Sequence, residues 1–132
     1  MAALDRPVVK PRPVYLNLLA IRLPLSALVS ILHRASGALL FLIGIPLLLW
    51  TVQSALATVE AWSAIRAALA QPFAKLVLLL LVGAYLLHLL AGVRHLVMDL
   101  HIGMNLASAR RSAAVVLVLA LVLTLAVAVR LW

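Results

Sequence analysis

The stretch KLVLLLLVGAYLLHLLAGVRHLVMD, residues 75–99, decides the fold of this chain. Residues 76–98 supply the roughly 20 apolar positions that a helix needs to cross a hydrocarbon core about 30 Å thick. His88 lies deep inside this stretch, where water is lost as a hydrogen-bond partner, so we expect it to face other protein. Because an ionisable residue inside a membrane is a functional candidate by default, we expect the function to reside near His88.

The composition places the whole chain in the class of integral membrane proteins. Of 132 residues, 67% are hydrophobic and 11% are charged, and the mean hydropathy is +1.26, far from the average of soluble domains. Cysteine is absent, which excludes disulfides, thiolate metal sites and cysteine-ligated iron–sulfur clusters within this chain. The net charge of +8 comes from scattered basic residues without a long basic run, so we expect no nucleic-acid partner.

The distribution of apolar segments predicts one all-α, integral membrane domain over residues 1–132, with three transmembrane helices. We expect the spans at about residues 26–52, 74–99 and 113–131. Pro46 should bend the first span, which membrane helices tolerate.

The remaining segments read as surface and connecting elements. Residues 1–25 are rich in proline, which blocks a long helix and favours extended backbone at the membrane surface. Residues 53–71 read as a short amphipathic connector with Trp62 suited to the interface. Residues 100–111 read as a polar loop, in which we expect His101 to be exposed. Trp132 closes the third span as an interfacial anchor.

The distribution of Lys and Arg predicts the orientation in the membrane. The N-terminal segment and the second connection carry Arg6, Lys10, Arg12, Arg22, Arg94, Arg110 and Arg111, against Arg66, Lys75 and Arg130 on the opposite side. The positive-inside rule then predicts a cytoplasmic N-terminus and a periplasmic C-terminus. The first residues resemble neither a signal peptide nor an Arg- and Ser-rich transit sequence, which favours a bacterial inner membrane protein.

A stripe of small and polar residues marks one face of the second span. Tyr85, His88, Gly92 and His95 recur at spacings of three and four, so they share that face. At about 1.5 Å per residue, His88 lies roughly 16 Å from Asp99, near mid-bilayer, while His95 lies near the cytoplasmic boundary. Gly92 should leave space for a flat group such as haem b, whose iron takes a neutral imidazole. The alternative is that His88 only hydrogen-bonds a neighbouring helix.

A bis-histidine haem site would need a second ligand. We expect His33 and His95 to lie too close to the cytoplasmic surface to bind the same iron as His88 from the opposite side. The second ligand would therefore come from another chain.

A second polar face lies on the first span, where Ser30, His33, Arg34 and Gly37 again recur at spacings of three and four. The forked donors of Arg34 suit a carboxylate, a quinone carbonyl or a haem propionate, and Ser30 adds a hydroxyl. The alternative is that Arg34 only snorkels to the membrane surface.

Near the end of the second span, Asp99 stands close to Arg94 and His95. This group could handle protons, or Asp99 could form a solvated ion pair with its basic neighbours.

Two longer motifs carry a resemblance. Residues 12–36, RPVYLNLLAIRLPLSALVSILHRAS, run from an Arg-Pro pair to a Ser-x-x-His-Arg-x-Ser cluster. Residues 88–99, HLLAGVRHLVMD, form a His-x-x-x-Gly-x-Arg-His pattern that ends in Asp. In order and spacing these motifs resemble the cytochrome b subunits of succinate dehydrogenase, the larger membrane anchors of complex II. His101 departs from the pattern, which has a small residue at that position.

The resemblance implies a site and a set of partners. It implies that His88 is one axial ligand of haem b, while a histidine of the small anchor subunit supplies the other within a heterodimeric helix bundle. It implies that Ser30 and Arg34 help to form a ubiquinone pocket beside the iron–sulfur subunit. His33, Arg34 and His95 would lie near the haem propionates.

The same resemblance implies the reaction. Electrons from succinate would pass through FAD in a flavoprotein subunit and through the clusters of the iron–sulfur subunit to ubiquinone, and this chain alone would oxidise no succinate. Three other functions fit the residues: an anchor of a quinol:fumarate reductase, a purely structural anchor without haem, and a small transporter or channel that uses the intramembrane His and Arg.

Overall fold

The computed structural model describes residues 22–132, and every regular element within that range is helical. The predicted all-α fold with three spans is confirmed, because three helical stretches are long and apolar enough to cross a membrane: Leu25–Ala55, Pro72–Asp99 and Leu106–Leu131. The sequence predicts a surface segment over residues 1–25, and residues 1–21 of that segment lie outside the described residues.

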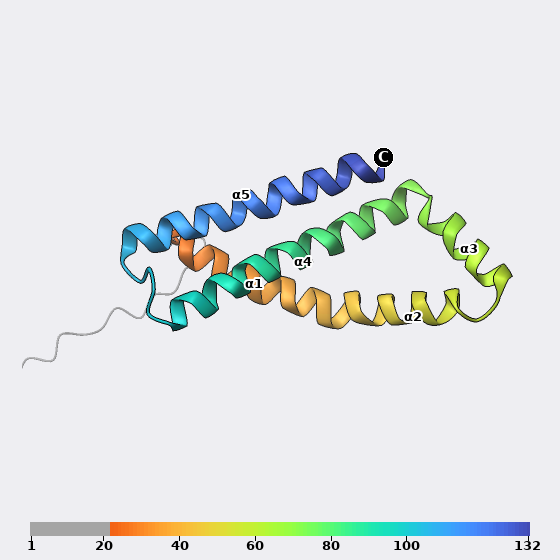
Figure 1. Ribbon diagram of the computed structural model, residues 1–132, viewed down its shortest axis with the longest axis horizontal. Coiled ribbons are helices and arrows are strands. Elements are labelled where there is room, and N and C mark those ends of the chain that lie inside the picture. The colour runs from red at the N-terminus through yellow and green to blue at the C-terminus, as the bar shows by residue number, and fades with distance from the viewer. Residues whose placement is uncertain (1–21) are drawn as a thin grey trace, which may run out of the picture.

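The first span bends where the sequence places Pro46. It consists of α1 (Leu25–Leu39), a π-helical turn η1 (Leu40–Gly44) and α2 (Ile45–Ala55). Proline lacks an N–H and its ring collides with the carbonyl four residues earlier, so a regular α-helix cannot continue through it undisturbed. The wider π turn absorbs the conflict, and the N–H of Ile45 donates to the carbonyl of Leu40. The change of direction between α1 and α2 is visible in Figure 1.

The predicted amphipathic connector is confirmed as α3 (Val59–Leu69). Its first turn is capped by Thr58, whose Oγ1 accepts from the N–H of Ala61 at 3.1 Å. Hydrogen bonds from the backbone N–H of Glu60 and from the Thr58 hydroxyl lower the pKa of the Glu60 carboxyl. A carboxylate at this end and Arg66 in the last turn both complement the helix dipole.

The other two spans, α4 (Pro72–Asp99) and α5 (Leu106–Leu131), lie side by side in Figure 1 and run in opposite directions. The buried contacts are made mainly by small side chains, with Ala91 and Ala113 fully buried together with Val29 of α1. Lipid tails are as apolar as leucine, so spans associate through close packing rather than through hydrophobic burial. Small residues allow that close approach.

A lysine fixes one end of the α4–α5 pair, and a short connection joins the two helices at the other end. At one end Lys75 donates from Nζ to the carbonyl of Leu131 at 2.8 Å and lies 5.5 Å from the ring centroid of Trp132. This bond satisfies one of the carbonyls that a helix C-terminus leaves without a partner. At the opposite end α4 turns into α5 through a short connection with positive φ at His101 and Gly103. His101 is exposed there, as predicted.

The predicted polar loop over residues 100–111 is wrong in its second half. Helix α5 begins at Leu106, because the side chain of Asn105 accepts from the N–H of Ser108 at 2.8 Å and so caps the helix. Arg110 and Arg111 are therefore helical residues rather than loop residues. Asn105 is a residue type that favours a helix N-cap, but the polar residues that follow it led to the prediction of a loop.

Candidate functional site

His88 projects from α4 toward α1, and its hydrogen bonds define its tautomer. Its Nδ1 lies 3.0 Å from the carbonyl oxygen of His33 and 3.3 Å from Oγ of Ser36. A carbonyl oxygen can only accept, so Nδ1 carries the hydrogen and donates it. In a neutral imidazole, Nε2 is then the nitrogen with the free lone pair, which is the form that binds metals.

Two small residues of α1 hold the ring in place. Ser36, only 6% exposed, donates from Oγ to the carbonyl of His33 at 2.9 Å. Gly37 leaves the space in which the ring sits, because a Cβ there would lie 2.8 Å from Cε1 of His88. No residue with a side chain could occupy position 37 without moving this imidazole.

Three histidines from two helices form a stack. The ring centroids of His33 and His88 are 4.2 Å apart with their planes 10° from parallel, and those of His33 and His95 are 5.1 Å apart at 21°. The Nδ1 of His95 donates to the carbonyl of Ala91 at 2.6 Å, so its orientation is also fixed. The stack leads from His88 within the span toward the end of α4.

The structure brings His33 closer to His88 than helical spacing alone indicates, because the two rings lie directly against each other. The space expected beside Gly92 is filled by the His33 ring, since a Cβ at position 92 would lie 3.3 Å from Nε2 of His33. Helical periodicity gives the height of a residue along its own helix and does not say which residues of two neighbouring helices meet.

Orientation nevertheless separates His33 from His88 as ligands. The lone pair of an imidazole nitrogen lies in the plane of its ring, and opposite axial ligands must direct their lone pairs at one another. Rings stacked face to face with nearly parallel planes do not do so. His33 is therefore not oriented to act as a second ligand opposite His88.

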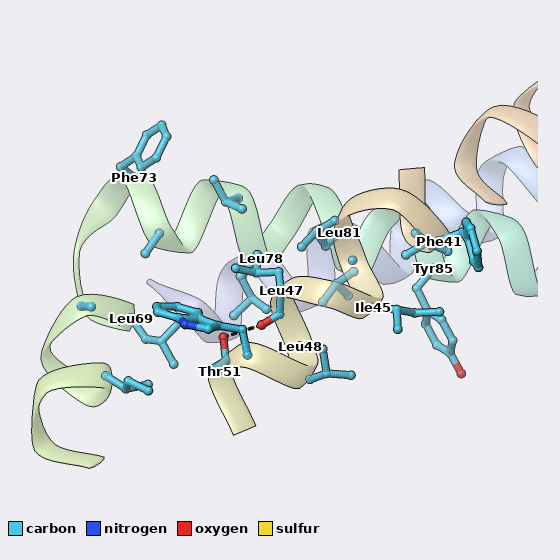
Figure 2. A pocket seen from close by; sticks show the side chains of 18 of the residues that line it. Phe41, Ile45, Leu47, Leu48, Thr51, Leu69, Phe73, Leu78, Leu81 and Tyr85 are labelled. Atoms are coloured by element: carbon cyan, nitrogen blue, oxygen red, sulfur yellow. Dashed lines mark hydrogen bonds between the residues drawn. The ribbon is translucent and has the colours of Figure 1, made fainter. Parts of the chain in front are cut away.

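A large apolar pocket begins at His88. It has a volume of about 960 Å³ and lies among η1, α2, α3 and α4. Figure 2 shows Leu47 of α2 and Leu78 of α4 facing this pocket, with Leu69 of α3 toward one end and Tyr85 toward the other. The hydroxyl of Thr51 is turned to the carbonyl of Leu47 at 2.7 Å, so it adds little polarity. The pocket is thus an apolar space with the imidazole of His88 among its lining groups.

The second predicted polar group lies on α1. Arg34 is exposed and donates from Nε to the carbonyl oxygen of Ser30 at 3.3 Å, one turn earlier in its own helix. Ser30 is half-buried beside it. The guanidinium is thereby held next to the Ser30 backbone while its remaining N–H groups face outward, which is an arrangement suited to binding a carbonyl or carboxylate oxygen.

Arg94 connects two helices and does not form the predicted pair with Asp99. It is buried and donates from Nε to Oγ of Ser112 at 2.9 Å and from Nη2 to the carbonyl of Ala109 at 3.2 Å. Asp99 is exposed at the end of α4. The guanidinium therefore joins α4 to the start of α5, and the predicted cluster of Asp99, Arg94 and His95 is not assembled.

Sequence reasoning assigned no role to Ser36, although the first motif ends at that residue. A signal was present, since position 36 follows His33 by three residues and shares its side of the helix. The sequence does not show that this side of α1 faces His88. The hydrogen bond between residues 52 positions apart in the chain is a product of helix packing.

Comparison with known proteins relates the chain to a protein family and to a curated relative. Residues 9–127 match the family described as succinate dehydrogenase/fumarate reductase transmembrane subunit. The chain is 35% identical over 122 residues to the succinate dehydrogenase cytochrome b556 subunit of Coxiella burnetii (strain RSA 493 / Nine Mile phase I), and this similarity covers 92% of the present chain and 97% of the relative.

Proposed function

The chain belongs to the family of succinate dehydrogenase/fumarate reductase transmembrane subunits and is a multi-pass membrane anchor subunit of succinate dehydrogenase, and we propose that it binds haem b through His88 and takes part in ubiquinone reduction. The observation that carries this proposal is the bond from Nδ1 of His88 to the carbonyl of His33, at 3.0 Å. A metal-binding histidine commonly donates its other ring nitrogen to such a carbonyl, which fixes its tautomer and orientation.

The residues around His88 fit a haem. The macrocycle is flat and largely apolar, and the pocket at His88 is lined almost entirely by apolar side chains. Because Gly37 has no side chain, it does not crowd the side of the His88 imidazole that faces it. When bound, haem b supplies a one-electron carrier whose potential depends on its ligands and their hydrogen bonds. The small anchor subunit would supply the second axial histidine.

Three side chains near His88 are candidates to bind the haem propionates. His33 and His95 belong to the same stack as His88, and Arg34 follows His33 directly in α1. Nδ1 of His95 is occupied by the Ala91 carbonyl, so Nε2 is its nitrogen for an outside partner. The cationic guanidinium of Arg34 would offset the negative charge of a propionate.

Ser30 and Arg34 would bind ubiquinone. The bond from Arg34 to the Ser30 backbone keeps the guanidinium one turn from its own residue, beside Ser30 on α1. A quinone gains electrons at its carbonyl oxygens, and a fixed cation with N–H donors stabilises the negative charge that develops there. The Ser30 hydroxyl would donate a further hydrogen bond. Arg34 thus has the chemistry of an electrostatic catalyst of quinone reduction.

The remaining parts of the reaction belong to partners. This chain has no cysteine, so FAD and the iron–sulfur clusters would reside in the flavoprotein and iron–sulfur subunits. The excess of basic residues on the side of Arg34 and Arg110 supports a cytoplasmic N-terminus and a periplasmic C-terminus in a bacterial inner membrane. The iron–sulfur subunit would then dock on the cytoplasmic side, beside Ser30 and Arg34.

The test is a reduced-minus-oxidised spectrum of the complex purified through this chain, with His88→Asn compared with wild type. The amide nitrogen of asparagine can replace Nδ1 as a donor to His33, but asparagine has no counterpart of Nε2. We expect a b-type signal in wild type and its loss in His88→Asn. His101→Asn is the matched control, because it replaces an exposed histidine whose φ of 63° suits asparagine.

Two outcomes would contradict the proposal. A wild-type complex that contains all subunits and no haem would favour a purely structural anchor. An unchanged b-type signal in His88→Asn would move the ligand to another residue. Succinate oxidation by an artificial dye, measured on each sample, shows whether the soluble subunits are assembled.

A further inference from the structure

We propose that Ser36 is a positioning residue for His88. Through its contact with Nδ1, Ser36 would set how strongly Nε2 of His88 donates electrons to the haem iron. This inference rests on the proposed haem site. It concerns one hydroxyl on α1 that lies 3.3 Å from Nδ1 of His88.

The geometry places the Nδ1 hydrogen of His88 between two oxygens. The carbonyl of His33 lies at 3.0 Å and Oγ of Ser36 at 3.3 Å, so the hydrogen is shared and the nearer carbonyl takes the larger part. The same two oxygens are joined to each other, because Ser36 donates from Oγ to the His33 carbonyl at 2.9 Å. The hydroxyl is thereby oriented with a lone pair toward Nδ1.

Burial makes this contact stronger than a similar one at a surface. Ser36 is only 6% exposed within an apolar span, and the low local polarity strengthens a hydrogen bond there. Hydrogen bonds accepted from Nδ1–H draw the proton away from the ring and increase the basicity of the opposite nitrogen. A more basic axial ligand stabilises ferric over ferrous iron, which lowers the reduction potential.

The contact also limits the rotation of the ring. His88 is held on one side by Gly37, which has no Cβ, and on one face by the His33 ring at 4.2 Å. These contacts fix the plane of the imidazole but do not distinguish its two orientations, which are related by a half-turn about the Cβ–Cγ bond and exchange Nδ1 with Cδ2. The pair of oxygens at Nδ1 is directional and fixes that rotation.

The experiment compares Ser36→Ala with wild type in the whole purified complex. We expect Ser36→Ala to retain the b-type spectrum, because the His33 carbonyl still accepts from Nδ1. We expect its midpoint potential to rise, and haem transfer to an added haem-binding apoprotein to become about ten-fold faster, as is typical for loss of an outer hydrogen bond to a metal ligand.

Two further variants separate this role from a simple packing effect. Ser36→Thr keeps the hydroxyl and should restore the potential and the transfer rate. Ser63→Ala is the matched control, because Ser63 also donates to the carbonyl three residues earlier, that of Glu60 at 2.7 Å, but lies far from any histidine in the exposed helix α3. It should behave like wild type.

The outcomes distinguish this inference from the haem proposal. A potential and transfer rate in Ser36→Ala equal to wild type, or a lowered potential, would overturn the role of Ser36 while His88 remains the ligand. An equal change in Ser36→Thr and Ser36→Ala would also overturn it, since volume and not the hydroxyl would be the cause. Absence of a haem signal that depends on His88 in the first place would overturn the proposed site itself.

Discussion

Arg94 on α4 donates from Nε to Oγ of Ser112 on α5 at 2.9 Å, and its side chain is buried, with only 7% of its surface exposed. Its Nη2 also donates to the carbonyl of Ala109. This contact anchors the third span beside the second near the turn that connects them. It also draws the guanidinium away from the histidine stack on the other side of α4.

Ser112→Ala should therefore lower the stability of the complex by about 1–3 kcal/mol, because a buried guanidinium loses a hydrogen-bond acceptor. The double variant Arg94→Met, Ser112→Ala should be more stable than Ser112→Ala alone, since it removes the unpaired donor as well. Thermal unfolding of the purified complex measures both. A double variant less stable than either single variant would contradict this account.

Gly37→Ala should release haem, since the new Cβ would lie 2.8 Å from Cε1 of His88 and push the ring from its two hydrogen-bond acceptors. We expect at least about ten-fold weaker haem retention. Gly44→Ala is the control in the same span, because its Cβ would meet the flexible end of Leu40 at 3.3 Å. The haem content per complex, measured as the pyridine haemochrome, should fall in the first variant only. Equal haem content in both would count against the role of Gly37.

Arg34→Ala should impair quinone reduction by about ten-fold or more, which corresponds to the loss of a charge-assisted hydrogen bond of about 1.5–3 kcal/mol. Succinate oxidation by an artificial dye should remain largely intact, because the dye does not need the quinone site. Arg34→Lys should recover only part of the activity, since lysine keeps the charge but not the forked donors. Arg110→Ala, an exposed cation on α5, is the control. Equal loss of both activities in Arg34→Ala would indicate an assembly defect instead.

Gly83→Leu should separate α4 from α5, because even a Cβ at position 83 would lie 3.2 Å from Cγ2 and 3.3 Å from Oγ1 of Thr124. Overpacking of this kind costs about 1–3 kcal/mol. Thr124→Ala in the Gly83→Leu background should recover part of the loss, since it removes the opposing atoms. Thermal unfolding of the two complexes tests this. No recovery would show that the strain arises elsewhere.

The sequence by itself determined the membrane class, the three spans, the connector α3 and the position of the bend. These features follow from local chemistry: the length of apolar runs, and the N–H that Pro46 lacks. It also singled out His88, since an ionisable residue in the middle of a span has few roles. The start of α5 at Leu106 was not predicted, although Asn105 is a typical N-cap residue.

Only the tertiary structure decided which residues meet. The contact of His33 with His88, the bond from His88 to Ser36, and the turn of Arg94 toward α5 all join residues on different helices. Periodicity defines faces within one helix, but the rotation and separation of neighbouring helices depend on how closely small residues let them approach. Gly37 and Ala91 set that approach between α1 and α4, and so they determine the site around His88.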